Sequence, residues 1–212
     1  MTTKSAPDST AGGRALSIVA ASHNPGKVAE LRCLLEPLGL VVVAAADSGV
    51  PVPDETADTF IGNAKLKAEA AMRATGLPAI ADDAGLEVAS LGGAPGVHSA
   101  RWGGSSRDFR IAIQRVLEAM KAADGCRDRA ASLTCGLCVC WPDGRIYLAE
   151  GRLQGHIATQ PRGRAGNGYD PIFVPLGFAA TLAEAPPMDP PVMPHRLAAF
   201  AQLPDGAFLH ER

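Results

Sequence analysis

The beginning of the chain contains a strand, a tight turn, a helix and a second strand in immediate succession. Residues 16–21 are a short apolar run, so we expect a buried strand there. Asn24 is a good N-cap and Pro25 a good first helical residue. Apolar side chains then recur at helical spacing until Gly39, at Val28, Leu31, Leu34, Leu35 and Leu38. Residues 40–46 are a second apolar run, and this alternation of strands and helices predicts a parallel core.

The rest of the chain adds further helices and a hairpin. We expect a helix over 60–75 between Thr59 and Gly76, a short strand over 79–81 that ends at Asp82 and Asp83, and a glycine-rich loop over 85–106. A helix beginning at Ser106, a hairpin turn at 142–144, a strand over 171–174 and a helix over 194–203 follow. The hairpin predicts that antiparallel strands are added to the parallel core. The expected fold class is therefore α/β, with a long mixed β-sheet flanked by helices.

Composition limits the class of protein. A chain of 212 residues fits one domain, which we place at 15–204, with a flexible N-terminal tail at 1–14 and a C-terminal tail at 205–212. The net charge of −2 argues against a broad basic surface, so we expect no nucleic acid as a partner. No apolar run approaches the roughly 18 residues that span a bilayer, and the first residues lack an apolar signal segment. We therefore expect no membrane partner and a cytoplasmic location.

Three of the five cysteines lie close together, at Cys135, Cys138 and Cys140. A four-ligand zinc site would need a second cluster of Cys or His at similar spacing, which the sequence lacks. An odd number of cysteines without an export signal argues against a set of disulfides. We therefore interpret residues 132–141 as a buried strand in which cysteine serves as a small apolar side chain.

A polar turn follows the first predicted strand. Backbone N–H groups and one ammonium can point at phosphate from this turn, which consists of Ser22, His23, Asn24, Pro25, Gly26 and Lys27. The turn lacks the Gly-x-x-x-x-Gly-Lys pattern of a Walker loop. Taken alone, the turn is more typical of an ordinary helix cap than of a phosphate site, since Asn-Pro begins many helices.

The second polar group is acidic. Asp82 and Asp83, with Glu55 from the preceding loop, form a set of oxygen ligands suited to Mg²⁺, which prefers a few carboxylates together with water and substrate phosphates. The alternative is a simple turn, where Asp before Gly is common. Lys65 and Lys67 on the preceding helix would, by themselves, be a solvated face.

A third polar group contains an aromatic ring, a carboxylate and a guanidinium, which together can frame a planar base. It comprises Asn167, Gly168, Tyr169, Asp170, His195 and Arg196. The alternative for Tyr169 and for Trp102 is a half-buried core aromatic. His195 and Arg196 would otherwise decorate a helix N-terminus, where cations are mildly unfavourable.

Together these stretches resemble the inosine/xanthosine triphosphate pyrophosphatase family of Ham1-like house-cleaning nucleotide hydrolases. The similarity runs from about residue 18 to residue 200 and rests on six segments in the same order, at 22–27, 55–67, 81–87, 93–102, 168–173 and 195–196. It implies two lobes with a central cleft, a homodimer, Mg²⁺ as cofactor and a small-molecule nucleotide as substrate. The implied reaction is the hydrolysis of ITP, dITP and XTP to the monophosphate and pyrophosphate.

The resemblance also implies roles for single residues. Asp83 is expected to be the general base and a metal ligand, Glu55 the other acidic ligand, and Asp82 a nearby third. Lys27 and Lys67 are expected to bind phosphate with the turn residues, while the third polar group faces the base.

Four departures from the family pattern fall on the substrate side. Asn167 stands where the family usually has an aromatic residue, Pro194 replaces a serine before His-Arg, and Ala84, counted among the substrate-binding positions, also replaces a serine. The usual lysine is missing from residues 188–193. We expect weaker or broader base selection with the same bond cleaved. Three alternatives stay open, namely a Maf-like pyrophosphatase with another base specificity, a non-catalytic nucleotide-binding protein, and a redox or zinc protein built on the cysteines.

Overall fold

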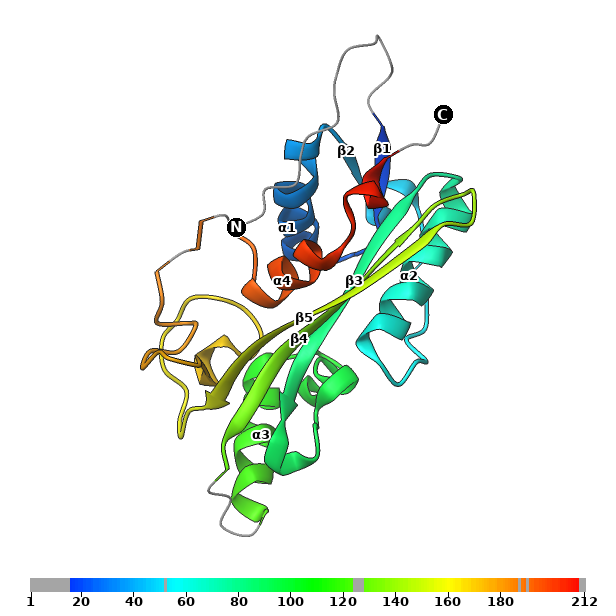
Figure 1. Ribbon diagram of the computed structural model, residues 1–212. Coiled ribbons are helices and arrows are strands. Elements are labelled where there is room, and N and C mark those ends of the chain that lie inside the picture. Colours follow the sequence, from blue (N-terminus) through cyan, green and yellow to red (C-terminus); the bar gives the residue numbers. More distant parts are fainter. Residues whose placement is uncertain (1–15, 52, 124–127, 187, 190, 210–212) are drawn as a thin grey trace. The chain divides into compact units, whose positions relative to one another are not determined.

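The computed structural model describes residues 16–209 except 52, 124–127, 187 and 190 (Figure 1). This part of the chain forms a sheet of six strands in the order β2-β1-β3-β4-β5-β6. Their bounds are β1 Ser17–Ala20, β2 Val41–Ala44, β3 Ala79–Val88, β4 Ala130–Cys140, β5 Ile146–Ile157 and β6 Phe173–Pro175. The α-helices are α1 Pro25–Leu35, α2 Phe60–Thr75, α3 Phe109–Ala122 and α4 Pro194–Gln202. Strand β1 pairs in parallel with β2 and β3, and β6 is antiparallel to β5, which confirms the mixed α/β fold.

The chain divides into two compact units. The first unit consists of Met1–Asp83, Gly136–Gly151 and Met188–Arg212, and the second of Ala84–Cys135 and Arg152–Pro187. Strands β3, β4 and β5 contribute residues to both units. Helices α1, α2 and α4 belong to the first unit and α3 to the second. Within the described part of the chain, every helix is too short or too polar to traverse a bilayer.

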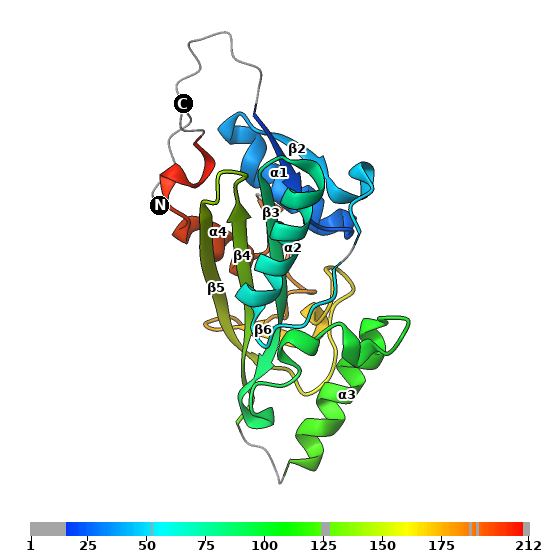
Figure 2. The same cartoon turned by 90° about the vertical axis from the view of Figure 1, so that its right-hand side faces the viewer.

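In the first unit, α2 covers one face of the strands, and α1 and α4 cover the other (Figures 1 and 2). Three of the five buried side chains of α2 are alanines, so the helix lies close to the strands. Ala64, Ala68 and Ala71 belong to one buried cluster with Cys138 and Cys140. The interpretation of the cysteine-rich segment as a buried strand is confirmed.

Strand β3 differs most from the sequence prediction. The strand was expected to end at residue 81, but it continues for ten residues from Ala79 to Val88. Asp82 and Asp83 therefore lie in the middle of a buried strand rather than at a strand tip or in a turn. A carboxylate is tolerated in such a place only when it is paired, and cations from helices on both faces pair with these two. The predicted loop over 85–106 begins only after Val88, and its residues include three short 3₁₀-helices, Ala89–Leu91, Gly96–His98 and Arg101–Gly103.

Three smaller predictions need correction. Helix α3 begins at Phe109 with Asp108 as its N-cap, rather than at Ser106, because the Asp108 carboxylate accepts the N–H of Arg110 at 2.9 Å. The predicted strand over 171–174 is a 3₁₀-helix, Asp170–Ile172, followed by β6. The C-terminal segment expected to be a tail is described as far as Leu209, and Asp205–Phe208 is a 3₁₀-helix in which Ala207 and Phe208 are buried. The predicted tail at 1–14 lies outside the described residues.

Trp141 connects this C-terminal segment to the hairpin between β4 and β5. Its indole Nε1 donates to the carbonyl of Ala207 at 2.9 Å, and the ring is almost fully buried. We expect Trp141→Phe to lower the free energy of unfolding by about 2 kcal/mol, because the carbonyl loses its donor and the smaller ring leaves a void. Urea unfolding measures this loss. Trp102→Phe, on a half-buried ring of the second unit, is the matched control, and an equal loss in both variants would contradict the assignment.

Candidate functional site

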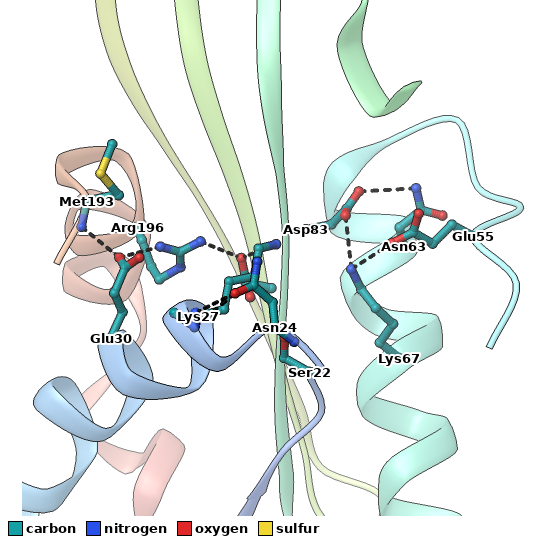
Figure 3. A network of polar contacts seen from close by, with 12 residues as sticks. Ser22, Asn24, Lys27, Glu30, Glu55, Asn63, Lys67, Asp83, Met193 and Arg196 are labelled. Atoms are coloured by element: carbon teal, nitrogen blue, oxygen red, sulfur yellow. Dashed lines mark hydrogen bonds and ion pairs between the residues drawn. The ribbon is translucent and has the colours of Figure 1, made fainter. Parts of the chain in front are cut away.

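Asp82 and Asp83 are neighbours on β3, and their side chains lie on opposite faces of the strand. Figure 3 shows Asp83 on the side of Lys67 and Asn63. Successive side chains of a strand alternate between its two faces. Asp83 contacts residues of α2, whereas Asp82 contacts residues of α1 and α4. The structure thus brings Glu55 and Asp83 together, but it places Asp82 in a different cluster. The sequence prediction had grouped all three.

The Asp83 cluster is centred on the ammonium of Lys67. Its Nζ lies 2.9 Å from Asp83 Oδ1 and 3.1 Å from Glu55 Oε1. Asn63 donates from Nδ2 to Asp83 Oδ2 at 3.2 Å, while its Oδ1 accepts the backbone N–H of Ala57 at 3.0 Å. Two carboxylates from separate segments therefore converge on one cationic group.

Asn63 was not predicted from the sequence, although a signal was available. It precedes Lys67 by four residues on the same helix, and side chains at that spacing share a face. Its amide ties Asp83 to the loop before α2, and so fixes the orientation of the carboxylate.

The two aspartates have pKa values shifted in opposite directions. Burial raises the pKa of Asp83 above its ordinary value, and this outweighs the lowering effect of Lys67. Burial would also raise the pKa of Asp82, but the cations Arg196 and Lys27 hold it far below the usual range. Neighbouring carboxyl groups with separated pKa values are typical of sites that divide proton transfer from charge stabilisation. Asp83 is thus the better proton acceptor, and Asp82 is a permanent anion.

Lys67 remains a cation in this environment. Burial alone would lower the pKa of its ammonium, but attraction to Asp83, Asp82 and Glu55 outweighs that effect, so the pKa is raised.

The Asp82 cluster joins α1, β3 and α4. Asp82, whose side chain is fully buried, lies 2.8 Å from Lys27 Nζ and 2.7 Å from a guanidinium nitrogen of Arg196. The other terminal nitrogen of Arg196 pairs with Glu30 on α1. Arg196 is thus held between two carboxylates (Figure 3).

Glu30 is a second residue that sequence reasoning missed. Its carboxylate also accepts the backbone N–H of Met193 at 2.7 Å. Met193 is the N-cap of α4 and provides no side-chain cap, and Pro194 follows it as the first helical residue. An anion at a helix N-terminus is stabilising. Glu30 on α1 therefore provides the anionic cap that the residues of α4 do not provide themselves.

We expect Glu30→Gln to lower the free energy of unfolding by about 1–2 kcal/mol, because a neutral amide replaces a charge-assisted partner of Arg196 and of the α4 N-terminus. Urea unfolding at neutral pH measures the loss. Glu36→Gln, on an exposed residue just beyond α1, should leave the stability unchanged. Equal stabilities of the wild type and Glu30→Gln would contradict the role of Glu30.

His195 lies beside this cluster in a buried position. Burial, assisted by the positive charge of Arg196, lowers the pKa of His195 to about 3, so the imidazole is neutral at physiological pH. Its Nδ1 and Asp82 Oδ1 are buried and have no hydrogen-bond partner among the described residues. The remaining turn residues His23 and Pro25 are exposed, while the Asn24 side chain accepts the N–H groups of Gly26 and Lys27 as a helix cap.

The donor set at Asp83 fits a divalent cation that also binds phosphate. Mg²⁺ is commonly held by one or two carboxylates, with water and substrate oxygens as the other ligands, and Glu55 and Asp83 already share one positive charge. Among the residues that the structure describes, no group of three or more His, Cys, Asp or Glu side chains is arranged to hold a metal by itself.

The other predicted substrate residues belong to the second unit, which begins with Ala84. Tyr169 is buried, donates from its hydroxyl to the carbonyl of Ser99 at 2.8 Å and meets the ring of Phe109 edge-on at 5.4 Å. Asp170 is buried as well and accepts the backbone N–H of Asn167 at 2.7 Å. Tyr169 is thus a core aromatic residue, and Asp170 stabilises the loop in which it lies. The side chain of Asn167 is exposed.

The chain is similar in sequence and in structure to known proteins. A sequence model of the Ham1 family matches residues 18–205. A dITP/XTP pyrophosphatase of Caulobacter vibrioides is 48% identical over 193 residues, which cover 90% of this chain and 97% of that one. A dITP/XTP pyrophosphatase of Ruegeria pomeroyi is 44% identical over 194 residues, covering 91% and 95%. The solved structure of a HAM1 protein from Coxiella burnetii superposes with a TM-score of 0.82 at 41% identity, covering 88% of this chain and 95% of that one. The chain belongs to the Ham1 family.

Proposed function

We propose that the protein hydrolyses non-canonical purine nucleoside triphosphates, namely ITP, dITP and XTP, to the nucleoside monophosphate and pyrophosphate. The observation that carries this proposal is the convergence of Glu55 and Asp83 on Lys67, in a chain whose relatives are dITP/XTP pyrophosphatases. A homodimer, which the family resemblance implies, and a cytoplasmic location, which we expect from the sequence, are parts of the same proposal.

Lys27 and Lys67 are the proposed phosphate-binding residues. A triphosphate carries about four negative charges near neutral pH, since its last ionisation lies near pH 6. Lys27 and Lys67 come from helices on the two faces of β3 and are both held by carboxylates of that strand. The N-terminus of α1, with Ser22 and Asn24 in its turn, adds backbone N–H groups that favour an anion.

The hydrolytic step needs a water molecule and a base. Asp83 is the proposed base, because its raised pKa and its fixed orientation by Asn63 suit it to take a proton from water. Glu55 and Asp83 are the residues that would hold Mg²⁺, which when bound supplies charge neutralisation and polarisation of a phosphoryl oxygen. Asp82 stays ionised and keeps Lys27 and Arg196 in place.

The proposed base-selecting groups are hydrogen-bond donors on α4. Hypoxanthine and xanthine carry a 6-keto acceptor where adenine carries an amino donor, so an N–H of Arg196 or His195 favours the keto bases. Asn167 offers no aromatic ring, and the loss of one stacking contact costs about 1–3 kcal/mol. We therefore infer that discrimination between purines is weaker or broader than in relatives that have the ring.

A substrate panel tests the proposal. We expect pyrophosphate release from ITP, dITP and XTP with Mg²⁺, little release from ATP, and no release in EDTA. Cleavage of pyrimidine or other modified nucleotides instead would favour the Maf-like alternative. Binding of ITP without release from any triphosphate would show a nucleotide-binding protein and refute the proposed catalysis.

A further inference from the structure

Two glycines on neighbouring strands lie where two helices touch the sheet with their backbones. Gly136 on β4 meets the first turn of α2, and Gly151 on β5 meets α4. Neither glycine has a positive φ, so backbone conformation does not require glycine at these positions. Glycine is required at both positions because a larger side chain has no space there.

The contacts leave no room for a methyl group. A Cβ on Gly136 would lie 2.5 Å from the nitrogen of Ile61 and 2.6 Å from the carbonyl carbon of Phe60. A Cβ on Gly151 would lie 2.1 Å from the nitrogen of Ala199 and 2.2 Å from the carbonyl oxygen of His195. These neighbours are backbone atoms, which cannot rotate away as a flexible side chain could. Ordinary contact begins at 3.4 Å, so either helix would have to move outward by about 1 Å, since tightly packed interiors transmit such strain.

Each helix carries one half of the proposed site. Helix α2 carries Asn63 and Lys67, which contact Asp83 at 3.2 and 2.9 Å. Helix α4 carries Arg196, which contacts Asp82 at 2.7 Å, and the backbone of His195 itself touches Gly151. The aspartates belong to β3, so a displaced helix changes these distances while the aspartates stay with the sheet.

We propose that Gly136 and Gly151 are positioning residues that set the two halves of the site independently, Gly136 for phosphate binding through α2 and Gly151 for base selection through α4. The inference rests on the proposed function, because it assigns the halves to phosphate and base. A 1 Å misplacement caused by a remote mutation can cost about 100-fold in reaction rate, so a single methyl group is a large enough change for a test.

Calorimetric titration with ligands in EDTA measures binding to each half of the site separately, because without a metal ion the ligands are not hydrolysed. Tripolyphosphate probes the phosphate half, and the ratio of the dissociation constants of ATP and ITP probes base selection. We expect Gly136→Ala to weaken tripolyphosphate binding about tenfold and to leave the ATP/ITP ratio unchanged. We expect Gly151→Ala to lower the ATP/ITP ratio at least fivefold and to leave tripolyphosphate binding unchanged. The fitted stoichiometry reports the folded fraction, so loss of folded protein does not imitate either result.

Gly206→Ala is the matched control, because a Cβ there meets nothing within 4 Å and φ is not positive. It should change neither quantity. Equal changes of both quantities in both variants, or no change in either, would overturn the inference. So would a variant that binds neither probe even in trimethylamine N-oxide, which favours the compact state, since that glycine would then serve folding alone. Wild-type protein without a preference for ITP over ATP would refute the proposed function instead, and tripolyphosphate would still test Gly136.

Discussion

Asp83→Asn is expected to lower kcat for ITP about 1000-fold, with a smaller effect on KM. A positioned general base contributes about 100- to 10,000-fold, and asparagine keeps the size of the side chain while it loses the ability to accept a proton. The same change removes one anion from Lys67 and one proposed ligand of Mg²⁺. Pyrophosphate release at saturating ITP and Mg²⁺ measures the loss.

The matched control for this prediction is Asp58→Asn. Asp58 is exposed just before α2 and should tolerate the change. If kcat of Asp83→Asn stays within a factor of three of the wild type, while ITP is still hydrolysed to the monophosphate, Asp83 is not the base.

Asp82→Ala is expected to have the largest effect on stability, a loss of about 3–5 kcal/mol in the free energy of unfolding. Removal of one partner from a buried ion pair leaves the other charge without compensation. Here Arg196, only 3% exposed, would lose Asp82 and keep Glu30, and Lys27 would lose its partner on β3. Urea unfolding at neutral pH measures the effect, with Asp47→Ala at an exposed position as control. A loss below about 1 kcal/mol, typical of surface pairs, would contradict the role of Asp82 as the central anion.

The same pair makes stability depend on pH in a defined direction. The pKa of Asp82 is lowered in the folded protein, so its stabilising contribution is present above the unfolded value of 3.8 and is lost as the pH falls below it. We expect the difference in unfolding free energy between wild type and Asp82→Ala to be full at about pH 6 and smaller at about pH 3. A difference that grows on acidification would show that the pKa is raised instead.

The elements that local chemistry determines were predictable from the sequence. The start of α1 at Asn24 and Pro25, and the bounds of α2 between Thr59 and Gly76, follow from side chains that cap their own helix. Strand β3 was not predictable in the same way. Two aspartates and a glycine are typical of a turn, and the strand continues through them only because lysine and arginine side chains from distant segments pair with the carboxylates.

The residues of the site also divide into those that the sequence predicts and those that only the tertiary structure reveals. Lys27, Glu55, Lys67 and Asp83 were predicted from residue types and family resemblance, and the structure brings Glu55, Lys67 and Asp83 into one cluster. Asn63 and Glu30 were missed, since their partners lie 20 and 166 residues away in the sequence. Gly136 and Gly151 were missed because only tertiary packing shows that a helix backbone lies against them.

The alternation of Asp82 and Asp83 across β3 makes this strand unusually sensitive to insertions and deletions. One residue gained or lost between Ala79 and Asp82 would reverse which face each carboxylate serves. The carboxylate of Asp83 would then lie beside Lys27 and Arg196, whose positive charges would keep it ionised. The carboxylate of Asp82 would lie beside Lys67 and would no longer hold Arg196. Homologous chains should therefore vary in length in the segments around β3 and keep a fixed number of residues within its first half.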